Sequence, residues 1–406
     1  MPCPASNAPE NHHMKIALIW KNDYPWDVRV EKIAHALRDA GHDVYLLCGN
    51  KNKLPREETI DGVNIVRLPF SRNNILNSLI SLPFYFNPFW LWMASAVVRR
   101  KGIGLVIVRD LPLISIGIYL KRKFRLSLIL DMAENYPAMY WDRIHKGGWT
   151  AIKSWFVKNP RLMEYTEKRA TEECDHIIVV VEESAQRLVA NGADRKKISI
   201  VSNTPDLRIF NNDIPAGKKD HVQLVYAGFI QARGMDIVVE SLAKTRHLGI
   251  PVKFVVIGEG HYLAELKRIT KNLHVEDRVE FKGWVKNTSI PAYIRDSDIG
   301  VIPHKKNPHS DTTVPNKLFD YMACAKAVIV SNAAPLKRIV EEEKCGRVFA
   351  AGSVESFSEA LTWMLQNREA VEEMGRNGAA AVQRRYNWDY DKAVLVRLVD
   401  GLAAGK

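Results

Sequence analysis

The feature that most constrains this chain is a repeated alternation of short apolar runs with segments of helical spacing. The first run is KIALIW at 15–20, and apolar residues then recur with helical spacing from 28 to 37. Gly41 would end that helix, and the run VYLL follows at 44–47. Continuous apolar runs of this length are typical of strands buried on both faces of a parallel sheet. The opening of the chain therefore predicts the first strand, helix and strand of a doubly wound α/β domain.

The same alternation continues along the whole chain, in two series. In the first half we expect further strands at 105–108, 128–130, 177–181 and 198–201. In the second half we expect strands at 224–226, 253–257, 279–281, 299–302 and 327–330, with helices between them and a helical tail at 355–404.

A polar, turn-rich segment at 203–220 separates the two series. Because 406 residues exceed what one compact core holds, we expect two domains. The expected division is a disordered extension at 1–13, a first domain at 14–208, a linker at 209–220, a second domain at 221–385, and a helix at 386–406 that packs back on the first domain.

Composition limits the classes of partner and the compartment. The net charge of +12 suits negatively charged partners such as nucleoside diphosphates, anionic lipid or nucleic acid. The five cysteines are scattered without a CxxC or Cys/His cluster, so we expect neither a disulfide framework nor structural zinc. No run of 18 apolar residues occurs, and 1–13 does not read as a signal peptide. These features favour a cytoplasmic protein.

An aromatic-rich stretch at 76–98 ends in the basic residues 99–101. Six aromatic residues fall within 84–93, and a second basic cluster follows at 121–125. Aromatic segments beside basic residues are typical of the lipid interface, which would attach the protein peripherally to the inner face of the membrane. Aromatic residues also fill cores, so a helix pair covering the first sheet is the alternative interpretation.

Glycines stand at the ends of three successive expected strands in the second half. Gly228 and Gly234 flank one loop, Gly258 follows the next strand, and Gly283 follows the third. Ligands of open α/β sheets bind at the carboxyl ends of the strands, where glycine allows close backbone approach. Arg233 stands in the first loop, just before a helix whose N-terminus favours phosphate. These features predict a diphosphate site at this edge of the second sheet.

A polar loop at 302–316 leads into a helix that begins with PNKLFD. We expect the amides of residues 317–319, together with the Lys317 side chain, to face a phosphate. Asp320 stands one turn further on, where a carboxylate accepts both hydroxyls of a ribose. A first-turn acid that complements the helix dipole is the alternative role for Asp320.

These stretches resemble glycosyltransferase family 4. The resemblance is carried by DVRVEKIAHALRDAGHDVYLL at 27–47, ISIVSNTPD at 198–206, the glycine loops, and PNKLFDYMACAKAVIVS at 315–331. It implies the GT-B fold, in which two Rossmann-like doubly wound domains face each other across a cleft. It also implies a retaining enzyme that moves a sugar from a nucleoside diphosphate to an acceptor hydroxyl. The domain at 14–208 would then hold the acceptor, and the domain at 221–385 the donor.

The resemblance assigns roles to individual residues. Arg233 would bind the diphosphate, Asp320 the ribose, and Gly283-Trp284-Val285 the base. The predicted catalytic residues are Arg233, Lys317 and Glu134. The predicted donor-binding residues are Gly228, Gly234, Gly258, Gly283, Trp284, Val285, Asp311, Thr312, Asn316, Leu318 and Asp320. The acceptor-side candidates are Asp27, Arg29 and Asp131.

The chain departs from the family pattern at four positions. The second acid of the Glu-x7-Glu pattern is Asp320 here, not Glu. The first acid of the Glu-x7-Glu pattern would fall at Thr312, with Asp311 beside it. Phe229 stands where an arginine often follows the first glycine, and Ala133 stands where relatives of the Asp131–Pro137 stretch carry histidine.

The predicted chemistry is electrostatic stabilisation of the leaving diphosphate by Arg233, Lys317 and helix N-termini, without a metal or another cofactor. The expected partners are a nucleotide-sugar donor, a glycan or lipid-linked acceptor and a membrane surface, not nucleic acid. Assembly of a bacterial-type polysaccharide, lipopolysaccharide or glycolipid would use such an enzyme. A UDP-sugar 2-epimerase and a non-catalytic nucleotide-sugar-binding protein remain as alternatives.

Overall fold

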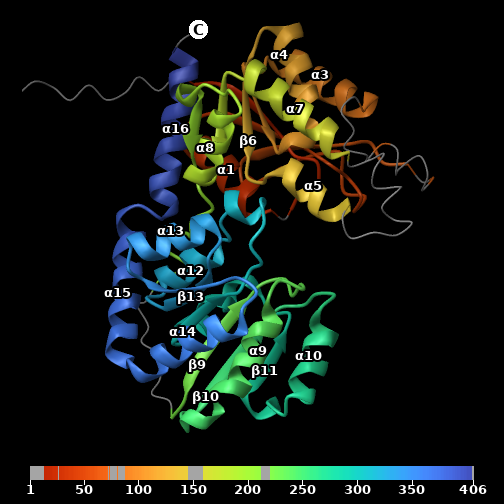
Figure 1. Ribbon diagram of the computed structural model, residues 1–406. Helices are drawn as coiled ribbons and strands as arrows, with labels where there is room; N and C mark the ends of the chain where they lie inside the picture. The colour runs from red at the N-terminus through yellow and green to blue at the C-terminus, as the bar shows by residue number, and fades with distance from the viewer. Residues whose placement is uncertain are drawn as a thin grey trace, which may run out of the picture. The chain divides into compact units, whose positions relative to one another are not determined.

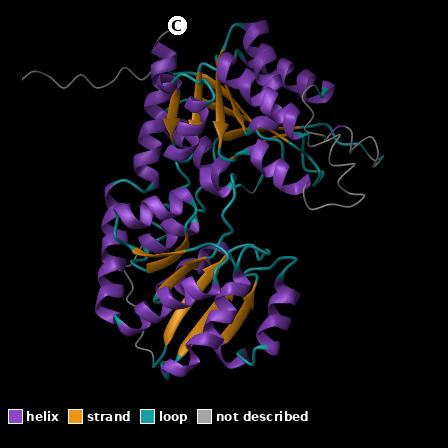
Figure 2. Cartoon of the chain, viewed as in Figure 1, coloured by secondary structure: helices purple, strands orange, loops and turns teal. Residues whose placement is uncertain are grey.

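The computed structural model describes residues 13–25, 27–71, 73, 80, 87–144, 159–211 and 220–404. These residues form two compact units, each built around its own parallel sheet (Figures 1 and 2). The N-terminal unit comprises Met1–Val180, Ser184–Val201 and Lys392–Lys406, and the C-terminal unit comprises Val181–Glu183 and Ser202–Asp391. The predicted fold of two Rossmann-like sheets is therefore confirmed. Most of the expected extension and linker, residues 1–12 and 212–219, lies outside the described residues.

The N-terminal sheet has eight strands in the order β3-β4-β2-β1-β5-β6-β7-β8. All neighbouring strands are parallel except β3 and β4. The strands are β1 (Lys15–Ile19), β2 (Asp43–Cys48), β3 (Glu57–Ile60), β4 (Val63–Arg67), β5 (Leu105–Arg109), β6 (Ser127–Met132), β7 (His176–Val179) and β8 (Ile198–Ile200).

Helices connect these strands on both faces of the sheet, as a doubly wound order requires. They are α1 (Val28–Asp39), α3 (Pro88–Lys101), α4 (Ile114–Phe124), α5 (Tyr136–Ile144), α7 (Pro160–Glu173) and α8 (Glu182–Ala190). Of these, α3, α4 and α7 pack side by side. The last helix, α16 (Trp388–Ala404), belongs to the N-terminal unit from Lys392 onward, where Lys392 pairs with Asp39 of α1 at 3.5 Å.

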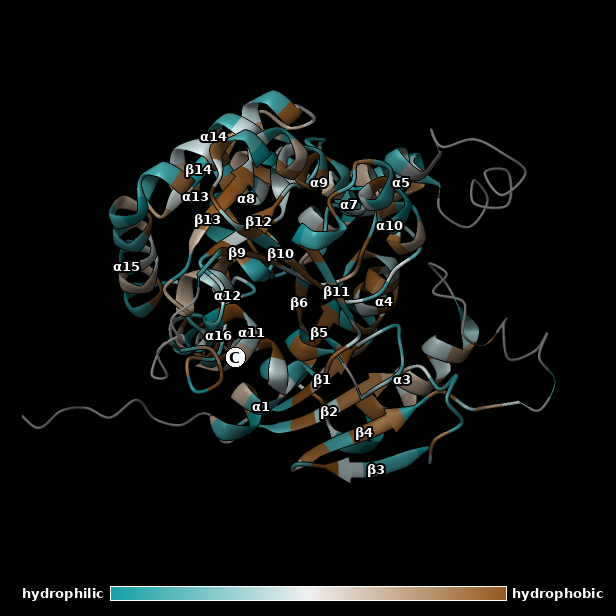
Figure 3. Cartoon of the chain, turned by 90° about the horizontal axis from the view of Figure 1, so that it is seen from below, coloured by the Kyte–Doolittle hydropathy of each residue, from teal (hydrophilic) through white to brown (hydrophobic). Residues whose placement is uncertain are grey.

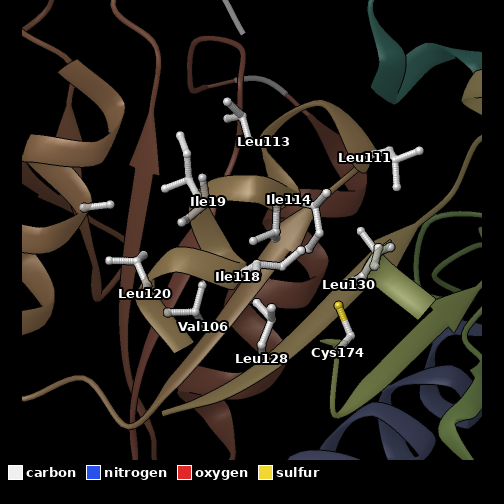
Figure 4. Close-up of a cluster of buried hydrophobic side chains, with 14 of the residues drawn as sticks. Ile19, Val106, Leu111, Leu113, Ile114, Ile118, Leu120, Leu128, Leu130 and Cys174 are labelled. Atoms are coloured by element: carbon white, nitrogen blue, oxygen red, sulfur yellow. The ribbon is translucent and has the colours of Figure 1, made fainter. Parts of the chain in front are cut away.

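The core of the N-terminal unit forms where α4 lies on β5 and β6. Figure 4 shows Ile114 and Ile118 of the helix beside Val106 and Leu128 of the strands. The helix approaches closely because Gly117 has no side chain: a Cβ there would lie 2.7 Å from atoms of both Val108 and Leu128. Apolar strands in Figure 3 appear in brown, while the outer helices carry hydrophilic faces in teal.

The aromatic stretch is divided between core and surface. Asn87 caps the start of α3, and Trp90 and Met93 of this helix are fully buried in the core. Trp92 points outward and is 53% exposed. Of the predicted interfacial stretch at 76–98, residues 76–79 and 81–86 lie outside the described residues.

The C-terminal sheet has six parallel strands in the order β11-β10-β9-β12-β13-β14. The strands are β9 (Val222–Ala227), β10 (Val252–Ile257), β11 (Val279–Gly283), β12 (Ile299–Ile302), β13 (Ala327–Ser331) and β14 (Gly346–Phe349). The helices are α9 (Met235–Lys244), α10 (Leu263–Asn272), α11 (Ile290–Arg295), α12 (Lys317–Ala323), α13 (Ala334–Glu342), α14 (Val354–Gln366) and α15 (Arg368–Arg384).

Two elements were missed from the sequence. The hairpin β3–β4 turns at Asp61 and Gly62, which both have positive φ. An Asp-Gly pair between alternating apolar residues is a strong hairpin signal, so this element could have been predicted. The edge strand β14 is short and mostly half-buried, and its pattern is therefore weak.

Candidate active site

The C-terminal sheet reverses its winding between β9 and β12. The chain proceeds from β9 outward to β10 and β11, and then returns to β12, which pairs with β9 on its other side. Such a switch point opens a crevice at the carboxyl ends of the two strands, where open α/β sheets bind ligands. Gly228 follows β9 and His304 lies two residues after β12, so both stand at this point.

The glycines at these strand ends allow the loops to pack on each other. A Cβ at Gly258 would lie 2.1 Å from the carbonyl oxygen of Gly228, and one at Gly234 would lie 2.0 Å from that of Pro303. A side chain at either position would displace a backbone. At Gly283, in contrast, nothing lies within 4 Å of the Cβ position. Gly258 and Gly234 therefore serve loop-to-loop contact, a reason other than the close ligand approach that we expected.

Lys317 reaches the first glycine loop from the start of α12. Its Nζ lies 3.6 Å from the centre of the Tyr226 ring and 2.9 Å from where a Cβ on Gly228 would be. A cation over an aromatic face is stabilised without being neutralised. Within the described parts of the chain, the Lys317 ammonium has no carboxylate partner.

Arg233 stands in the same loop, directly before Gly234, and is exposed. Its side chain forms no ion pair with any described residue. Arg233 and Lys317 both lower the pKa of the half-buried His304 through charge repulsion, as does His309. The structure therefore brings the two predicted cations to one place, with two histidines beside them.

His304 and His309 were not predicted as site residues. The signal for His304 was present, because it lies just beyond a buried strand, as do the glycines. Burial and then the neighbouring cations hold the pKa of His304 well below its ordinary value. The imidazole is therefore neutral at pH 7.

The first turn of α12 matches only part of the phosphate site that we expected there. The amides of Leu318 and Phe319 donate to the carbonyls of Pro315 and Asn316, at 3.1 and 3.0 Å, within the turn itself. The Leu318 side chain is buried, whereas Asn316 is exposed. These two amides are already hydrogen-bonded, so the Lys317 side chain is the clearer feature for binding an anion at this turn.

The edge expected to hold the base carries an exposed aromatic residue. Trp284 follows the positive-φ Gly283 at the end of β11 and is 68% exposed, while Val285 is half-buried. Asp320 is half-buried one turn into α12. A flat exposed ring provides a stacking surface for a base.

In the N-terminal unit, Arg29 and Asp131 form a buried ion pair. Arg29 donates from Nη2 to Asp131 Oδ1 at 2.6 Å and from Nε to Oδ2 at 3.0 Å. Asp131 is fully buried at the end of β6. Burial alone would raise the pKa of Asp131, but the Arg29 and Arg109 guanidiniums hold it below its ordinary value. The pair therefore joins α1 to the sheet, which is a structural role for two residues that we expected on the acceptor side.

The other two predicted residues of this unit, Asp27 and Glu134, are both half-buried. Asp27 caps α1 by accepting a hydrogen bond from the Val30 amide at 2.9 Å. Glu134 is half-buried two residues after β6 and remains a candidate for acceptor contact.

The N-terminal sheet has its own switch point, between β1 and β5, and the sequence did not single out its residues. Arg109 ends β5 and pairs with Asp110 at 2.7 Å and with Asp131 at 3.5 Å. Asp110, which has φ 68, accepts from the Tyr136 hydroxyl at 3.0 Å, and Lys21 donates to the same hydroxyl. Burial raises the pKa of Asp110 and, more strongly, that of Tyr136. The two arginines here are each paired with a buried carboxylate.

Two family models match this chain. One, described as "Glycosyl transferase 4-like domain", matches residues 27–204, and one described as "Glycosyl transferases group 1" matches residues 208–381. The chain belongs to glycosyltransferase family 4. The predicted family is therefore confirmed, and the two matches divide the chain close to the boundary between its two units.

A GDP-mannose-dependent alpha-(1-6)-phosphatidylinositol monomannoside mannosyltransferase of Mycobacterium tuberculosis is 26% identical over 174 residues, 42% of this chain. That match spans 45% of the relative, less than half its length.

Two solved structures share the fold. Sucrose-phosphate synthase from Thermosynechococcus elongatus has a TM-score of 0.77 at 18% identity, covering 97% of this chain and 100% of that one. HepE from Anabaena in complex with UDP has a TM-score of 0.70 at 14% identity, covering 96% and 100%.

At two of the departures from the family 4 pattern, the side chains have defined surroundings. The Asp311 carboxylate accepts from the Ala334 amide at 2.8 Å and so holds the start of α13. Thr312 is buried, and its hydroxyl donates to the Pro308 carbonyl at 2.9 Å. Phe229 is 58% exposed beside His261. Asp311 therefore holds α13 in place, while Lys317 adds a second cation to the glycine loop that carries Arg233.

Proposed function

We propose that this protein transfers a sugar from a nucleoside-diphosphate sugar to an acceptor hydroxyl, with retention at the anomeric carbon. The observation that carries this proposal is the pair of cations at the switch point of the C-terminal unit. Arg233 and Lys317 converge there without a carboxylate partner among the described residues. Cations that nothing in the protein neutralises are suited to a dianionic diphosphate.

The transfer breaks the bond between the anomeric carbon and the diphosphate oxygen. Negative charge develops on that oxygen as it leaves, and Arg233 and Lys317 are placed to stabilise it. The acceptor oxygen bonds to the same face of the anomeric carbon, and its proton passes to the departing phosphate. No metal is required in this scheme. Among the described residues, no group of three His, Cys, Asp or Glu side chains gathers as a metal site would require.

Base and ribose recognition completes the donor site. Trp284 and Val285 would hold the base, and Asp320 the ribose hydroxyls, as the family pattern implies. The names of the similar proteins include both GDP-mannose and UDP, so they leave the base open.

The acceptor would bind to the N-terminal unit, with Glu134 as the candidate contact. The mannosyltransferase relative is named for a phosphatidylinositol acceptor, which supports a lipid-linked or glycan acceptor for this chain. Assembly of a polysaccharide, lipopolysaccharide or glycolipid is the corresponding role.

We also propose peripheral attachment to the inner membrane face through α3. Its last turn carries Arg99, Arg100 and Lys101, and the outward-facing Trp92 lies with its ring 5.0 Å from the Arg56 guanidinium carbon. The second cluster supports this less, because Lys121 pairs with Asp175 at 2.7 Å and Arg122 with Glu173. In the described part of the chain, no helix has the length and apolar character needed to cross a membrane.

One observation favours a second function, non-catalytic binding of nucleotide sugars. Thr312 stands where the family pattern has an acid, and the neighbouring Asp311 is hydrogen-bonded to α13. A catalytic set for an epimerase is not apparent in the sequence.

The test has two steps. A thermal-shift screen of UDP-, GDP-, ADP- and dTDP-sugars identifies the donor, because a ligand that binds the native state raises its apparent stability. Steady release of nucleoside diphosphate that depends on an acceptor then shows transfer. Binding without release on any acceptor, including lipid-linked sugars, would favour the binding protein.

A further inference from the structure

His304 lies among the cations of the proposed diphosphate site. The loop that carries it touches the first glycine loop, since a Cβ at Gly234 would lie 2.0 Å from the carbonyl oxygen of Pro303. Lys317 reaches the other end of that glycine loop, at Gly228. Three segments distant in sequence therefore meet at the first glycine loop: that loop itself, the loop that carries His304, and the start of α12.

Each of these three segments carries a group whose positive charge disfavours protonation of His304. Lys317 acts from α12, Arg233 from the loop before α9, and His309 from the loop that carries His304 itself. The one acid in the first turn of α12, Asp320, does not offset them, because burial and these three neighbours together hold the pKa of His304 well below its ordinary value. An imidazole that gains a nearby anion becomes easier to protonate.

We propose that His304 takes up a proton from solvent when the donor diphosphate binds, and so becomes a third cation of the site. This inference rests on the proposed function, because it needs a diphosphate at Arg233 and Lys317. The bound dianion offsets the repulsion from the two permanent cations, and the imidazole of His304 charges in response. The side chains of Arg233, Lys317 and His304 thereby carry two positive charges when the site is empty and three when it is filled.

The direction of the pH dependence follows from linkage. Binding that takes up a proton strengthens as pH falls, by at most about tenfold per pH unit for one proton. The increase occurs between the pKa of His304 in the complex and its lower pKa in the free protein. Above that window His304 is neutral in both states, so its charge contributes nothing to affinity.

The experiment measures the affinity of a nucleotide sugar by calorimetry from about pH 8 to about pH 5.5. Nucleotide sugars are used because their diphosphate is esterified at both ends and does not titrate in this range. The probes are UDP-glucose, GDP-mannose, ADP-glucose and dTDP-glucose, and the series uses whichever binds the full-length protein. We expect the wild type to bind more tightly as pH falls and the His304→Asn variant to lose this slope. The variant should match the wild type near pH 8 and fall behind at lower pH, a pattern that a purely structural defect would not give.

Two histidine variants serve as matched controls. His309→Asn removes the second imidazole of the site, and His176→Asn removes a histidine of the N-terminal unit whose pKa burial also lowers. His176→Asn should keep the pH slope, and His309→Asn separates the contributions of the two imidazoles of the site. If the slope disappears in His309→Asn but not in His304→Asn, the assignment to His304 is overturned.

The remaining outcomes separate this inference from the proposed function. Binding by the wild type that does not change with pH contradicts proton uptake and leaves the proposed function standing. Failure of all four nucleotide sugars to bind at any pH contradicts the proposed function, and the inference falls with it. Histidine NMR titration of the wild type gives an independent readout: the His304 signal, assigned by its loss in His304→Asn, should titrate at higher pH in the complex.

Discussion

The two switch points of this molecule have the same topology but differ in how their charged side chains are paired. In the N-terminal unit, Arg29 and Arg109 are buried against Asp131 and Asp110. In the C-terminal unit, Arg233 and Lys317 have no carboxylate partner among the described residues. A crevice with balanced charge suits a neutral sugar hydroxyl, and one with excess positive charge suits a diphosphate. The difference supports the proposal that charge pairing, not the sheet, assigns the ligand to each unit.

The largest effect should come from breaking the buried pair. Arg29→Met leaves Asp131 charged and buried without its main partner, which should lower the free energy of unfolding by about 3–5 kcal/mol. Arg233→Met, at an exposed site without an ion pair, should change stability by less than about 0.5 kcal/mol. Urea denaturation of both variants measures the contrast. Equal losses of stability would mean that the two switch points do not differ as described.

The second prediction concerns binding, for which substitutions in the C-terminal unit should have the large effect. Arg233→Met and Lys317→Met should each weaken nucleoside diphosphate binding by about 1.5–3 kcal/mol, because each removes a charge-assisted contact. Calorimetry with the free diphosphate measures this. The matched control is Lys305→Met, an exposed lysine beside His304, which should change affinity less. Unchanged affinity in Arg233→Met would remove Arg233 from the site.

A smaller effect tests the acid within the cationic site. Asp320→Asn should weaken binding of ribonucleotides more than that of 2′,3′-dideoxynucleotides, because a carboxylate accepts more strongly than an amide from the two hydroxyls. If Asp320 only complements the helix dipole, the change is about 0.3–1 kcal/mol in stability and equal for both nucleotides.

The next prediction concerns membrane binding by the surface of the N-terminal unit. Trp92→Ser should reduce flotation with anionic vesicles while preserving the fold, and Trp90→Ser should instead destabilise the protein, because only Trp90 is buried. Each basic residue near the surface contributes about 1 kcal/mol of attraction, which salt screens. A wild type that stays unbound on such vesicles contradicts membrane attachment.

The smallest effect expected is that of metal removal. Because Arg233 and Lys317 supply the positive charge, turnover should be unchanged after treatment with a chelator. Activity that is lost with the chelator and restored by Mg²⁺ or Mn²⁺ would show that the C-terminal site depends on a cation that its side chains do not provide.

The sequence predicted the parts of the fold that follow local patterns. Apolar runs located eleven of the fourteen strands that the structure describes, most clearly where burial is continuous, as in β5 and β6. Glycines marked the carboxyl ends of three strands of the second sheet. The strands β3 and β14 are short and partly exposed, and their patterns are correspondingly weak. The order of strands in a sheet also determines which strand ends are neighbours. Once β9 and β12 were known to be adjacent, Gly228 and His304 could have been placed at the same edge.

Long-range pairing is what the sequence could not provide. Arg29 and Asp131 lie 102 positions apart, and nothing local distinguishes their buried pair from two accessible polar residues. The same holds for Asp311, whose hydrogen bond to Ala334 forms only when α13 is placed beside it. Residue type predicted the chemistry available, whereas the tertiary fold determined which groups remain accessible to a ligand.

The close contacts between the glycine loops constrain how this site varies through evolution. Gly258 packs on the Gly228 carbonyl and Gly234 on that of Pro303, so a substitution at one position requires a compensating shift in another loop. These backbones are therefore expected to be inherited together, whichever sugar nucleotide is used. Diversification of donor choice would fall instead on side chains that project from the fixed loops, such as Phe229 and Trp284, which are free to change without disturbing the framework.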